Sequence, residues 1–433
     1  MSEFQVSRAT RPLRGAVRVP ADKSISHRAA MLAALAEGDT RIENFLDSAT
    51  TRATLDCLRA LGVEISAPDA PALTVHGRGL RELREPRETL FCAGSGTTMR
   101  LLAGICAGQD FFSLLDGTPA LQRRPMARVI EPLRAMGATI LGREQNSYAP
   151  FAIRGTSRLQ GIECTMKVAS AQVKSAILFA GLYADAPTTV REPAPSRDHT
   201  ERMLKAFGAQ IENPDSAIRI HPISNLQSPN SIFIPGDFSS AAFFIVAALL
   251  TPHSEICLTG VGLNPTRTGL LDALAAMGAR VTIENGRAES GEPVADVIVR
   301  AADGLQGTRV AGTLVPRMID EFPIFAVAAT QARGDTDVRD AQELRVKESD
   351  RITTMAQELR KMGARIEERV DGFSIQGPTR LRGARVSAHG DHRLALALAV
   401  AGLLAEGETI IADWECIADS FPDFAETLAG LTR

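Results

Sequence analysis

The sequence of 433 residues has few aromatic residues and no long hydrophobic run. Aromatic residues make up 5% of the chain, with one Trp and two Tyr. The longest apolar stretches, 241–250 and 394–405, are shorter than the ~20 residues that a membrane-spanning helix requires. The first 15 residues contain no apolar core typical of a signal peptide. We therefore expect a cytoplasmic protein without membrane contact, in which both stretches form helices buried on all sides.

The sequence also lacks paired cysteines and an excess of positive charge. Its six cysteines, at positions 57, 92, 106, 164, 257 and 416, form no CxxC pair. Neither their spacing nor that of His, Asp and Glu is typical of a metal site, so we predict reduced thiols and no metal. The net charge of −3 argues against a general nucleic-acid-binding protein, because such proteins usually carry a basic face.

The sequence does contain a short pattern that occurs six times. Polar residues precede an apolar helical stretch, and a turn and a β-rich stretch follow it. With Ser24, Thr97, Ser170, Ser239, Asp320 and Asp391 as markers, the steps are 73, 73, 69, 81 and 71 residues. Such a period predicts copies of one supersecondary unit. Because a helix N-terminus has unpaired N–H groups and a partial positive charge, six converging ends would bind a strongly anionic ligand.

A second element follows each of the first five apolar stretches. It has apolar residues at i, i+3 and i+6 with charged residues between them, which is typical of a half-exposed helix. Each copy ends at a glycine suited to a left-handed position after the helix, namely Gly62, Gly137, Gly208, Gly278 and Gly363. The sixth copy would be 423–431, which lacks this glycine.

Six units suggest two halves of three. The turn-rich segment between Asn225 and Pro235 lies between the third and fourth apolar helices. We predict an α/β protein with two similar domains, 21–234 and 235–433, each with three buried helices inside a shell of sheet and surface helix. From the pattern alone, residues 1–20 could pair with either half. Fully apolar helices argue against a doubly wound parallel sheet, in which helices are half exposed.

Two strings at the predicted helix starts have the chemistry of an anion site. Lys23, Ser24 and Arg28 combine a point charge, a hydroxyl and a guanidinium, which suits phosphate or carboxylate. The alternative is a helix cap followed by solvated basic residues. The string Gly94-Ser95-Gly96-Thr97 is a glycine-rich turn that lets backbone N–H groups approach a ligand closely, or it is a plain tight turn.

Further charged strings lie next to other predicted helices. The pair Arg123-Arg124 precedes a helix that we expect to hold Pro125 in its first turn. The string Arg345-Val346-Lys347-Glu348-Ser349-Asp350-Arg351 is either an exposed face or a carboxylate acid flanked by cations. Asp320-Glu321 contains a candidate base or a helix cap, and Asp391-His392-Arg393 also fits a cap.

Eight strings in this order resemble the 5-enolpyruvylshikimate-3-phosphate synthase family over about residues 8–430: ADKSISHRA, AGSGTTMR, QRRPM, SAQVKSA, SRDHTE, PGDFSSAAFF, RVKESDR and GDHRLALA. The strings SAQVK, RDHTE and NPTR are similar to its bacterial class II branch. The resemblance implies two inverted α/β domains that close on the substrates, the enolpyruvyl transferase fold, with residues 1–20 joining the C-terminal domain. It also implies transfer of enolpyruvyl from phosphoenolpyruvate to the 5-hydroxyl of shikimate 3-phosphate, in aromatic amino-acid biosynthesis.

The resemblance implies roles for individual residues. Those expected to hold shikimate 3-phosphate are Lys23, Ser24, Arg28, Ser170, Gln172, Arg197, Asp320 and Lys347. Those expected to hold phosphoenolpyruvate are Lys23, Gly96, Arg124, Gln172, Arg351 and Arg393. Asp320 would accept the proton of the attacking hydroxyl, Glu348 would protonate the methylene carbon, and Lys23 would assist catalysis. No cofactor is required, and we expect a monomer whose only partners are the two substrates.

The chain departs from the family pattern at four positions: Gly94 and Glu343 each stand where Asn is common, His199 replaces a substrate-facing Tyr, and Asp419 replaces a Lys of many class I members. The nearest alternative enzyme is UDP-N-acetylglucosamine enolpyruvyl transferase, which usually has a reactive Cys before the Arg-Pro pair. Residues 116–124 contain no Cys. A non-catalytic repeat scaffold would not explain the charged residues at the helix starts. An RNA-terminal phosphate cyclase-like protein is disfavoured because the chain lacks a basic, aromatic-rich surface.

Overall fold

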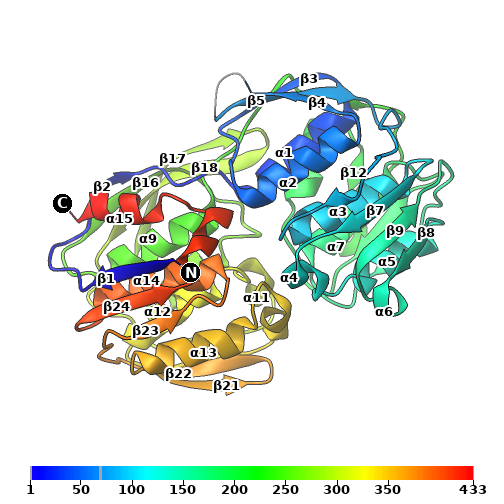
Figure 1. Ribbon diagram of the computed structural model, residues 1–433. Helices are drawn as coiled ribbons and strands as arrows, with labels where there is room; N and C mark the ends of the chain where they lie inside the picture. Colours follow the sequence, from blue (N-terminus) through cyan, green and yellow to red (C-terminus); the bar gives the residue numbers. More distant parts are fainter. Residues whose placement is uncertain (1, 68–70, 433) are drawn as a thin grey trace. The chain divides into compact units, whose positions relative to one another are not determined.

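A computed structural model describes residues 2–67 and 71–432 (Figure 1). The chain divides into two compact units. Unit 1 contains Met1–Pro20, Pro235–Arg287 and Pro293–Arg433, and unit 2 contains Ala21–Ile234 and Ala288–Glu292. The sequence predicts that the short segment Ala288–Glu292 belongs with the C-terminal half. It packs with unit 2 instead, because His199 of that unit bonds to Glu292.

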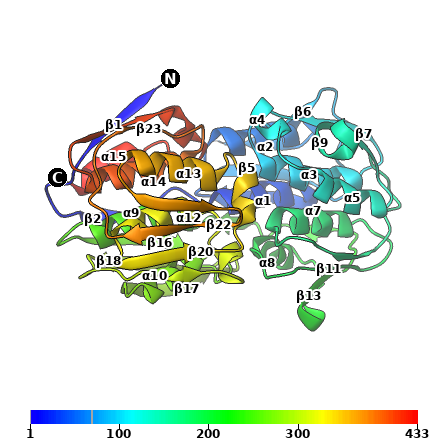
Figure 2. The ribbon, with the colours of Figure 1, turned by 90° about the horizontal axis from the view of Figure 1, so that it is seen from below.

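Three apolar helices form the centre of unit 2: α1 (Lys23–Leu35), α3 (Gly96–Ala107) and α7 (Ala171–Gly181). Helix α3 packs against both α1 and α7 (Figure 2). A Cβ on Gly104 would lie 2.1 Å from the carbonyl oxygen of Ala176, so only glycine lets the backbones of α3 and α7 approach this closely. The three helices are buried along nearly their whole length, as their sequences predict.

Unit 1 has the same kind of centre, made of α9 (Phe238–Leu250), α12 (Phe322–Gln331) and α14 (His392–Leu404). These three helices pack against one another. The apolar stretches 241–250 and 394–405 fall almost wholly within α9 and α14, and they are buried on all sides, which confirms the prediction. In the described part of the chain, no helix is both long and apolar enough to cross a membrane.

Three sheets surround the helices of unit 2. Their orders are β14-β3-β5-β4 with β15 also paired to β3, β6-β7-β9-β8, and β10-β11-β13-β12. The strands are β3 (Ala36–Glu43), β4 (Glu64–Ser66), β5 (Leu73–Arg78), β6 (Leu90–Phe91), β7 (Phe112–Asp116), β8 (Thr139–Gly142), β9 (Tyr148–Arg154), β10 (Glu163–Thr165), β11 (Thr188–Arg191), β12 (Ile211–Glu212), β13 (Ala217–Ile220), β14 (Leu226–Gln227) and β15 (Ser231–Phe233).

Unit 1 also has three sheets, with the orders β1-β24-β23, β17-β18-β16-β2 and β19-β20-β22-β21. The strands are β1 (Glu3–Ser7), β2 (Arg14–Val17), β16 (Glu255–Gly262), β17 (Val281–Glu289), β18 (Glu292–Arg300), β19 (Arg309–Val310), β20 (Gly334–Val338), β21 (Arg365–Arg369), β22 (Gly372–Gly377), β23 (Arg385–Ser387) and β24 (Glu408–Ala412). Strands β1 and β2 carry the N-terminal residues into this unit, where they pair with β24 and β16.

Four of the six sheets contain a parallel strand pair whose two strands flank one buried helix in sequence, for example β6 and β7 around α3. At the junction of the units the chain exchanges one strand each way. Strand β2 precedes α1 but pairs with β16 of unit 1, whereas β15 precedes α9 but pairs with β3 of unit 2. This exchange explains why the repeat pattern alone left residues 1–20 without a partner.

Six surface helices complete the repeats: α2 (Ala49–Ala60), α5 (Ala127–Ala135), α8 (His199–Ala206), α10 (Gly269–Ala276), α13 (Arg351–Lys361) and α15 (Phe424–Leu431). The five predicted glycines all have positive φ, between 86° and 111°, as left-handed positions after a helix require. The prediction for Pro125 is wrong, because α5 begins at Ala127 after its N-cap Met126. Short helical turns are α4 (Pro119–Gln122), α6 (Arg143–Asn146), α11 (Leu314–Arg317), η1 (Pro214–Ser216), η2 (Gln342–Val346) and η3 (Trp414–Asp419).

Candidate active site

The N-termini of the buried helices are built by local capping. Five of the six have an N-cap side chain that accepts a hydrogen bond from the first turn, namely Asp22, Ser95, Ser170, Asp237 and Asp391. Helix α12 differs, because its N-cap Glu321 makes no such bond. Asp320 binds arginines instead, so these two carboxylates are not simply a helix cap.

In unit 2, two guanidinium groups meet over the N-terminus of α3. A Cβ on Gly96 would lie 2.7 Å from Nη1 of Arg100 and 3.0 Å from Nη1 of Arg124. The first distance is shorter than real Cβ contacts and the second is tighter than most, so a larger residue at position 96 would displace the ends of the two arginine side chains from this point. With the N–H groups of the first turn of α3, they form an environment suited to an anion.

Arg100 connects this point to α7. Its Nη1 donates to Oε1 of Gln172 at 2.5 Å, and Nε2 of Gln172 donates to the hydroxyl of Thr97 at 2.8 Å. The structure thus brings the predicted residues Gly96, Arg124 and Gln172 together. Arg100, which is 1% exposed, lies with them in this candidate site, although sequence reasoning missed it. Its position four residues after Gly96, on the same helix face, was the available signal. We call Gly96, Thr97, Arg100, Arg124 and Gln172 the guanidinium cluster.

Arg28 is a predicted ligand of shikimate 3-phosphate, and its guanidinium binds protein groups in unit 2. Its Nε donates to the hydroxyl of Thr200 at 2.7 Å, and its Nη2 donates to the hydroxyl of Ser175 at 3.0 Å. Its Nη1 donates to the carbonyl of Ser24 at 2.9 Å. The side chain is 3% exposed. Arg28 therefore joins the starts of α1, α7 and α8, and supplies positive charge beneath the first turn of α1.

Beside Arg28, a chain of buried hydroxyl groups leads from His27 to the cap of α3. Nδ1 of His27 lies 2.6 Å from the hydroxyl of Thr54, which lies 2.6 Å from that of Thr98. The Thr98 hydroxyl donates to the N-cap oxygen of Ser95 at 2.7 Å. Burial, with added repulsion from the nearby cations of α1, lowers the pKa of His27 from 6.5 to about 3. His27 is therefore a neutral structural residue at physiological pH.

The other predicted residues of unit 2 lie at helix starts or just before them. Lys23 and Ser24 occupy the first turn of α1. Ser170 caps α7, accepting from the N–H of Val173 at 3.5 Å. Arg197 lies in the loop between β11 and α8. His199 departs from the expected place of a substrate-facing residue, because it is 2% exposed and its Nδ1 lies 2.7 Å from Oε1 of Glu292.

In unit 1, one arginine joins three carboxylates. Nη1 of Arg351 donates to Asp320 at 3.2 Å, and Nη2 donates to Glu348 at 2.7 Å. Its Nε donates to Asp391, the N-cap of α14, at 2.8 Å. A second arginine, Arg393, lies 3.4 Å from the other oxygen of Asp320. We call Asp320, Glu348, Arg351, Asp391 and Arg393 the carboxylate cluster. Sequence reasoning had not included Asp391 among the site residues.

The side chains of the carboxylate cluster differ in their exposure to solvent. The side chain of Arg351 is 1% exposed and that of Asp391 is 0% exposed, whereas Asp320 is 15% and Glu348 is 31% exposed. Burial alone would lower the pKa of Arg351, but the three carboxylates outweigh it and raise the pKa. The guanidinium is therefore a fixed charge that orients two reachable carboxylates, Asp320 and Glu348.

The segment that carries Lys347 and Glu348 is held from both sides. Asp350 caps α13 by accepting from the N–H of Thr353 at 3.1 Å, and it binds Nη1 of Arg345 at 2.8 Å. Arg345 also donates to the carbonyl of Val370 at 2.8 Å. The charged string is therefore an anchored turn rather than a solvated face, and Lys347 and Glu348 lie just before α13. Glu343, one of the departures, lies in the preceding turn η2.

The start of α9, the fourth of the repeated polar segments, makes a buried network of its own. Nη2 of Arg267 donates to Asp237 at 2.7 Å and to the hydroxyl of Ser239 at 2.9 Å. The Ser239 hydroxyl donates to Glu321, which directly follows Asp320 in the chain. All four residues are at most 3% exposed. This network therefore fixes the backbone next to Asp320 from beneath.

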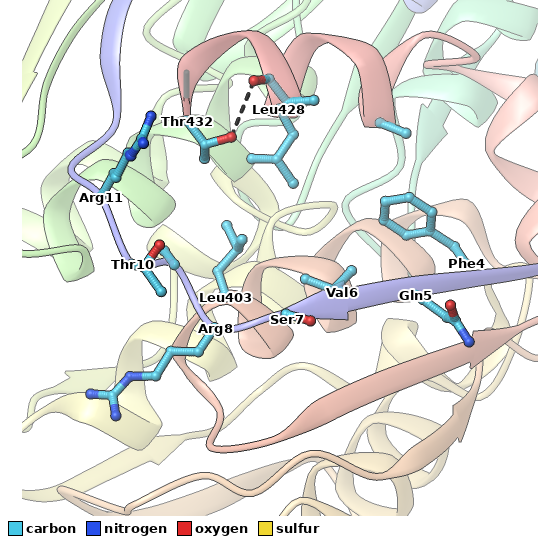
Figure 3. Close-up of a pocket in the computed structure, with 13 residues that line it drawn as sticks. Phe4, Gln5, Val6, Ser7, Arg8, Thr10, Arg11, Leu403, Leu428 and Thr432 are labelled. Carbon is cyan, nitrogen blue, oxygen red and sulfur yellow. Dashed lines mark hydrogen bonds between the residues drawn. The ribbon is translucent and has the colours of Figure 1, made fainter.

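Unit 1 also has a cavity of about 550 Å³ that is unrelated to the carboxylate cluster (Figure 3). It is lined by β1, the end of α14 at Leu403 and residues of α15 such as Leu428. Leu403 and Arg393 lie ten residues apart on α14, which corresponds to about 15 Å along the helix. The carboxylate cluster therefore does not line this cavity. Among the described residues, no group of three His, Cys, Asp or Glu side chains could hold a metal ion.

Comparison with known proteins gives one consistent result. The family described as EPSP synthase (3-phosphoshikimate 1-carboxyvinyltransferase) matches residues 7–428. The chain is 55% identical over 421 residues to the 3-phosphoshikimate 1-carboxyvinyltransferase of Desulforudis audaxviator, covering 97% of each chain. It is 50% identical over 433 residues to that of a Geobacter species, covering 100% of each chain.

Solved structures agree. The chain matches the EPSP synthase of Acinetobacter baumannii with a TM-score of 0.88 and 41% identity, covering 99% of this chain and 98% of that one. It matches the enolpyruvyl transferase NikO of Streptomyces tendae with a TM-score of 0.79 and 20% identity, covering 99% and 97%. The second match concerns the fold alone. The predicted enolpyruvyl transferase fold is confirmed.

Proposed function

The chain belongs to the EPSP synthase family, and we propose that it transfers enolpyruvyl from phosphoenolpyruvate to the 5-hydroxyl of shikimate 3-phosphate. Phosphate is the second product. The observation that carries the proposal is the Arg351 guanidinium, which holds Asp320 and Glu348 at 3.2 and 2.7 Å. Addition to an enol phosphate needs one group that accepts a proton and one that donates it, and these two reachable carboxylates meet that need.

The proposed chemistry has two steps. In the first step, Asp320 takes the proton of the 5-hydroxyl while the hydroxyl oxygen bonds to C2 of phosphoenolpyruvate. Glu348 gives a proton to the methylene carbon in the same step. In the elimination, the Glu348 carboxylate takes a proton back from the new methyl group, the double bond forms again, and the bond between C2 and the phosphate oxygen breaks as phosphate leaves. Positive charge develops at C2 during protonation. The fixed guanidinium groups bind the phosphate and the carboxylate of phosphoenolpyruvate, and in this way they orient the reactant.

We further propose how the substrates are held. Phosphoenolpyruvate brings a phosphate and a carboxylate, which suit Lys23, Gly96, Arg124 and Gln172 of unit 2, with Arg100 added, and Arg351 and Arg393 of unit 1. Shikimate 3-phosphate suits Lys23, Ser24, Arg28, Ser170, Gln172 and Arg197, with Asp320 and Lys347 of unit 1. We also propose that the protein is a monomer in the cytoplasm of a bacterium and that it belongs to the class II branch. The two units would correspond to the predicted domains.

The assay that tests the proposal measures phosphate release from phosphoenolpyruvate with two alternative acceptors. We expect release with shikimate 3-phosphate and only background release with UDP-N-acetylglucosamine. Mass spectrometry of the product should show shikimate 3-phosphate carrying one enolpyruvyl group. Equal release with UDP-N-acetylglucosamine, or none with shikimate 3-phosphate, would overturn the assignment.

A further inference from the structure

Unit 2 contains a buried ammonium group that the proposed chemistry does not use. Nζ of Lys174, on α7, lies 2.9 Å from Oε2 of Glu192 and 2.7 Å from Oε1 of Glu201. The side chains are 1%, 4% and 9% exposed. Burial alone would lower the pKa of Lys174, but the two carboxylates raise it, so the group stays charged. We call these three residues the lysine triad.

The lysine triad surrounds the loop that carries Arg197. Glu192 opens the loop directly after β11, and Glu201 lies in the first turn of α8, directly after the loop. Nζ of Lys174 also donates to the carbonyl of Ser196, the residue before Arg197, at 3.3 Å. A single ammonium group therefore contacts the loop at its start, next to Arg197 and at its end.

The loop depends on side-chain contacts for its shape. Residues 192–198 form no helix or strand, and prolines at 193 and 195 remove two backbone donors. Glu192 closes the loop by accepting from both the N–H of Ser196, at 3.4 Å, and the hydroxyl of Ser196. Its carboxylate is in turn held by Lys174. The backbone before Arg197 is thus held by contacts that converge on Lys174, while Arg202 holds Asp198 after it.

Stability alone is a poor explanation for this arrangement. Burying an ammonium group and two carboxylates has a desolvation cost that often cancels their attraction, and apolar residues of similar volume are frequently as stable. Burial raises the pKa of Glu201 despite the nearby Lys174, which shows that this cost is present here. Charged groups provide a directed set of hydrogen bonds to one loop, which apolar side chains do not provide.

We propose that Lys174 is a positioning residue that holds the 192–198 loop so that Arg197 meets shikimate 3-phosphate. This inference rests on the proposed function, because it takes Arg197 as a ligand of that substrate. The ammonium group contacts no substrate. It acts on the binding of shikimate 3-phosphate and leaves the binding of phosphoenolpyruvate, at the guanidinium cluster, unchanged.

The test separates the two Michaelis constants. In Lys174→Met we expect the KM for shikimate 3-phosphate to rise about tenfold or more, because the loss of hydrogen bonds from a charged group is worth this much. The KM for phosphoenolpyruvate and kcat should stay within about threefold of the starting protein. Lys174→Arg keeps a cation and should recover most of the affinity. Lys205→Met removes an exposed lysine from α8 and serves as the matched control.

A second variant distinguishes a loss of positioning from a loss of folding. Lys174→Met with Glu192→Gln and Glu201→Gln leaves no buried charge unpaired, and it should show the same selective rise in KM. Circular dichroism and thermal unfolding report on the fold of each variant. Unchanged KM for shikimate 3-phosphate, a parallel rise of both KM values, or failure of both Met variants to fold would each overturn the positioning role. If the unmodified protein does not use shikimate 3-phosphate, the proposed function itself fails.

Discussion

Units 1 and 2 have the same scaffold but place different chemistry at the starts of their buried helices. In unit 2, Arg100 and Arg124 meet over Gly96 with no carboxylate in that cluster. In unit 1, the carboxylates of Asp320 and Glu348 share one buried guanidinium. Each unit has its own three sheets around its own three buried helices. Repetition thus supplied the helix N-termini, and a few side chains give unit 2 a cluster of guanidinium groups without a carboxylate and unit 1 a cluster in which carboxylates pair with arginines.

The largest expected effect comes from removing the proton-transfer groups of unit 1. Asp320→Asn and Glu348→Gln keep the size of each side chain and should each lower kcat by a factor of about 10²–10⁴, as typical for an acid or base. Steady-state kinetics with both substrates measures this. Glu367→Gln, at an exposed carboxylate on β21 of the same unit, is the control and should retain full activity. Near-normal rates in both active-site variants would mean that unit 1 also only binds anions.

The anion-binding assignment of unit 2 is tested at Gly96. A Cβ there would push the guanidinium groups of Arg100 and Arg124 away, so Gly96→Ala should raise the KM for phosphoenolpyruvate about 10- to 100-fold, with a smaller change in kcat. Gly94→Ala in the same turn is a matched control, because no atom lies within 4 Å of its added Cβ. An equal effect of both substitutions would show that the turn, rather than the guanidinium cluster, was disturbed.

A smaller effect concerns the stability of unit 2 in acid. The folded protein holds His27 with a pKa of about 3 against 6.5 when unfolded, so the unfolded chain binds the extra proton first. The stability is complete above pH 6.5 and is lost as the pH falls from 6.5 toward 3. Between pH 7 and pH 5 the loss should be about 2 kcal/mol.

Urea unfolding at the two pH values, followed by circular dichroism, measures the loss. His27→Asn keeps a hydrogen-bonding group near Thr54 but cannot titrate, so its stability should change less with pH than that of the starting protein. His253→Asn, at an exposed histidine of unit 1, is the control and should keep the original pH dependence. If His27→Asn shows the same loss as the starting protein, the acid sensitivity lies elsewhere.

Much of the fold could be predicted because its signals are local. The buried helices followed from apolar runs, the surface helices from their period, and the helix ends from glycines with positive φ. The strand exchange of β2 and β15 could not be predicted from the repeat pattern, because strands of three or four residues carry no sequence mark of their partner. The contacts of Ala288–Glu292 with unit 2, such as His199 with Glu292 and Phe233 with Ser290, have no mark in the sequence for the same reason.

The sequence by itself determined which polar residues stand at the helix N-termini, because capping joins residues two or three positions apart. Tertiary structure alone decided how they pair. Arg351 meets Asp391 across 40 residues, and Arg100 meets Gln172 across 72. Such contacts depend on how separate helices pack, and the order of the motifs in the sequence does not give the distances between their side chains. The helix N-termini therefore follow from the repeat and the different side chains at them from the sequence of each unit, whereas the geometry of both clusters follows from the packing of the buried helices.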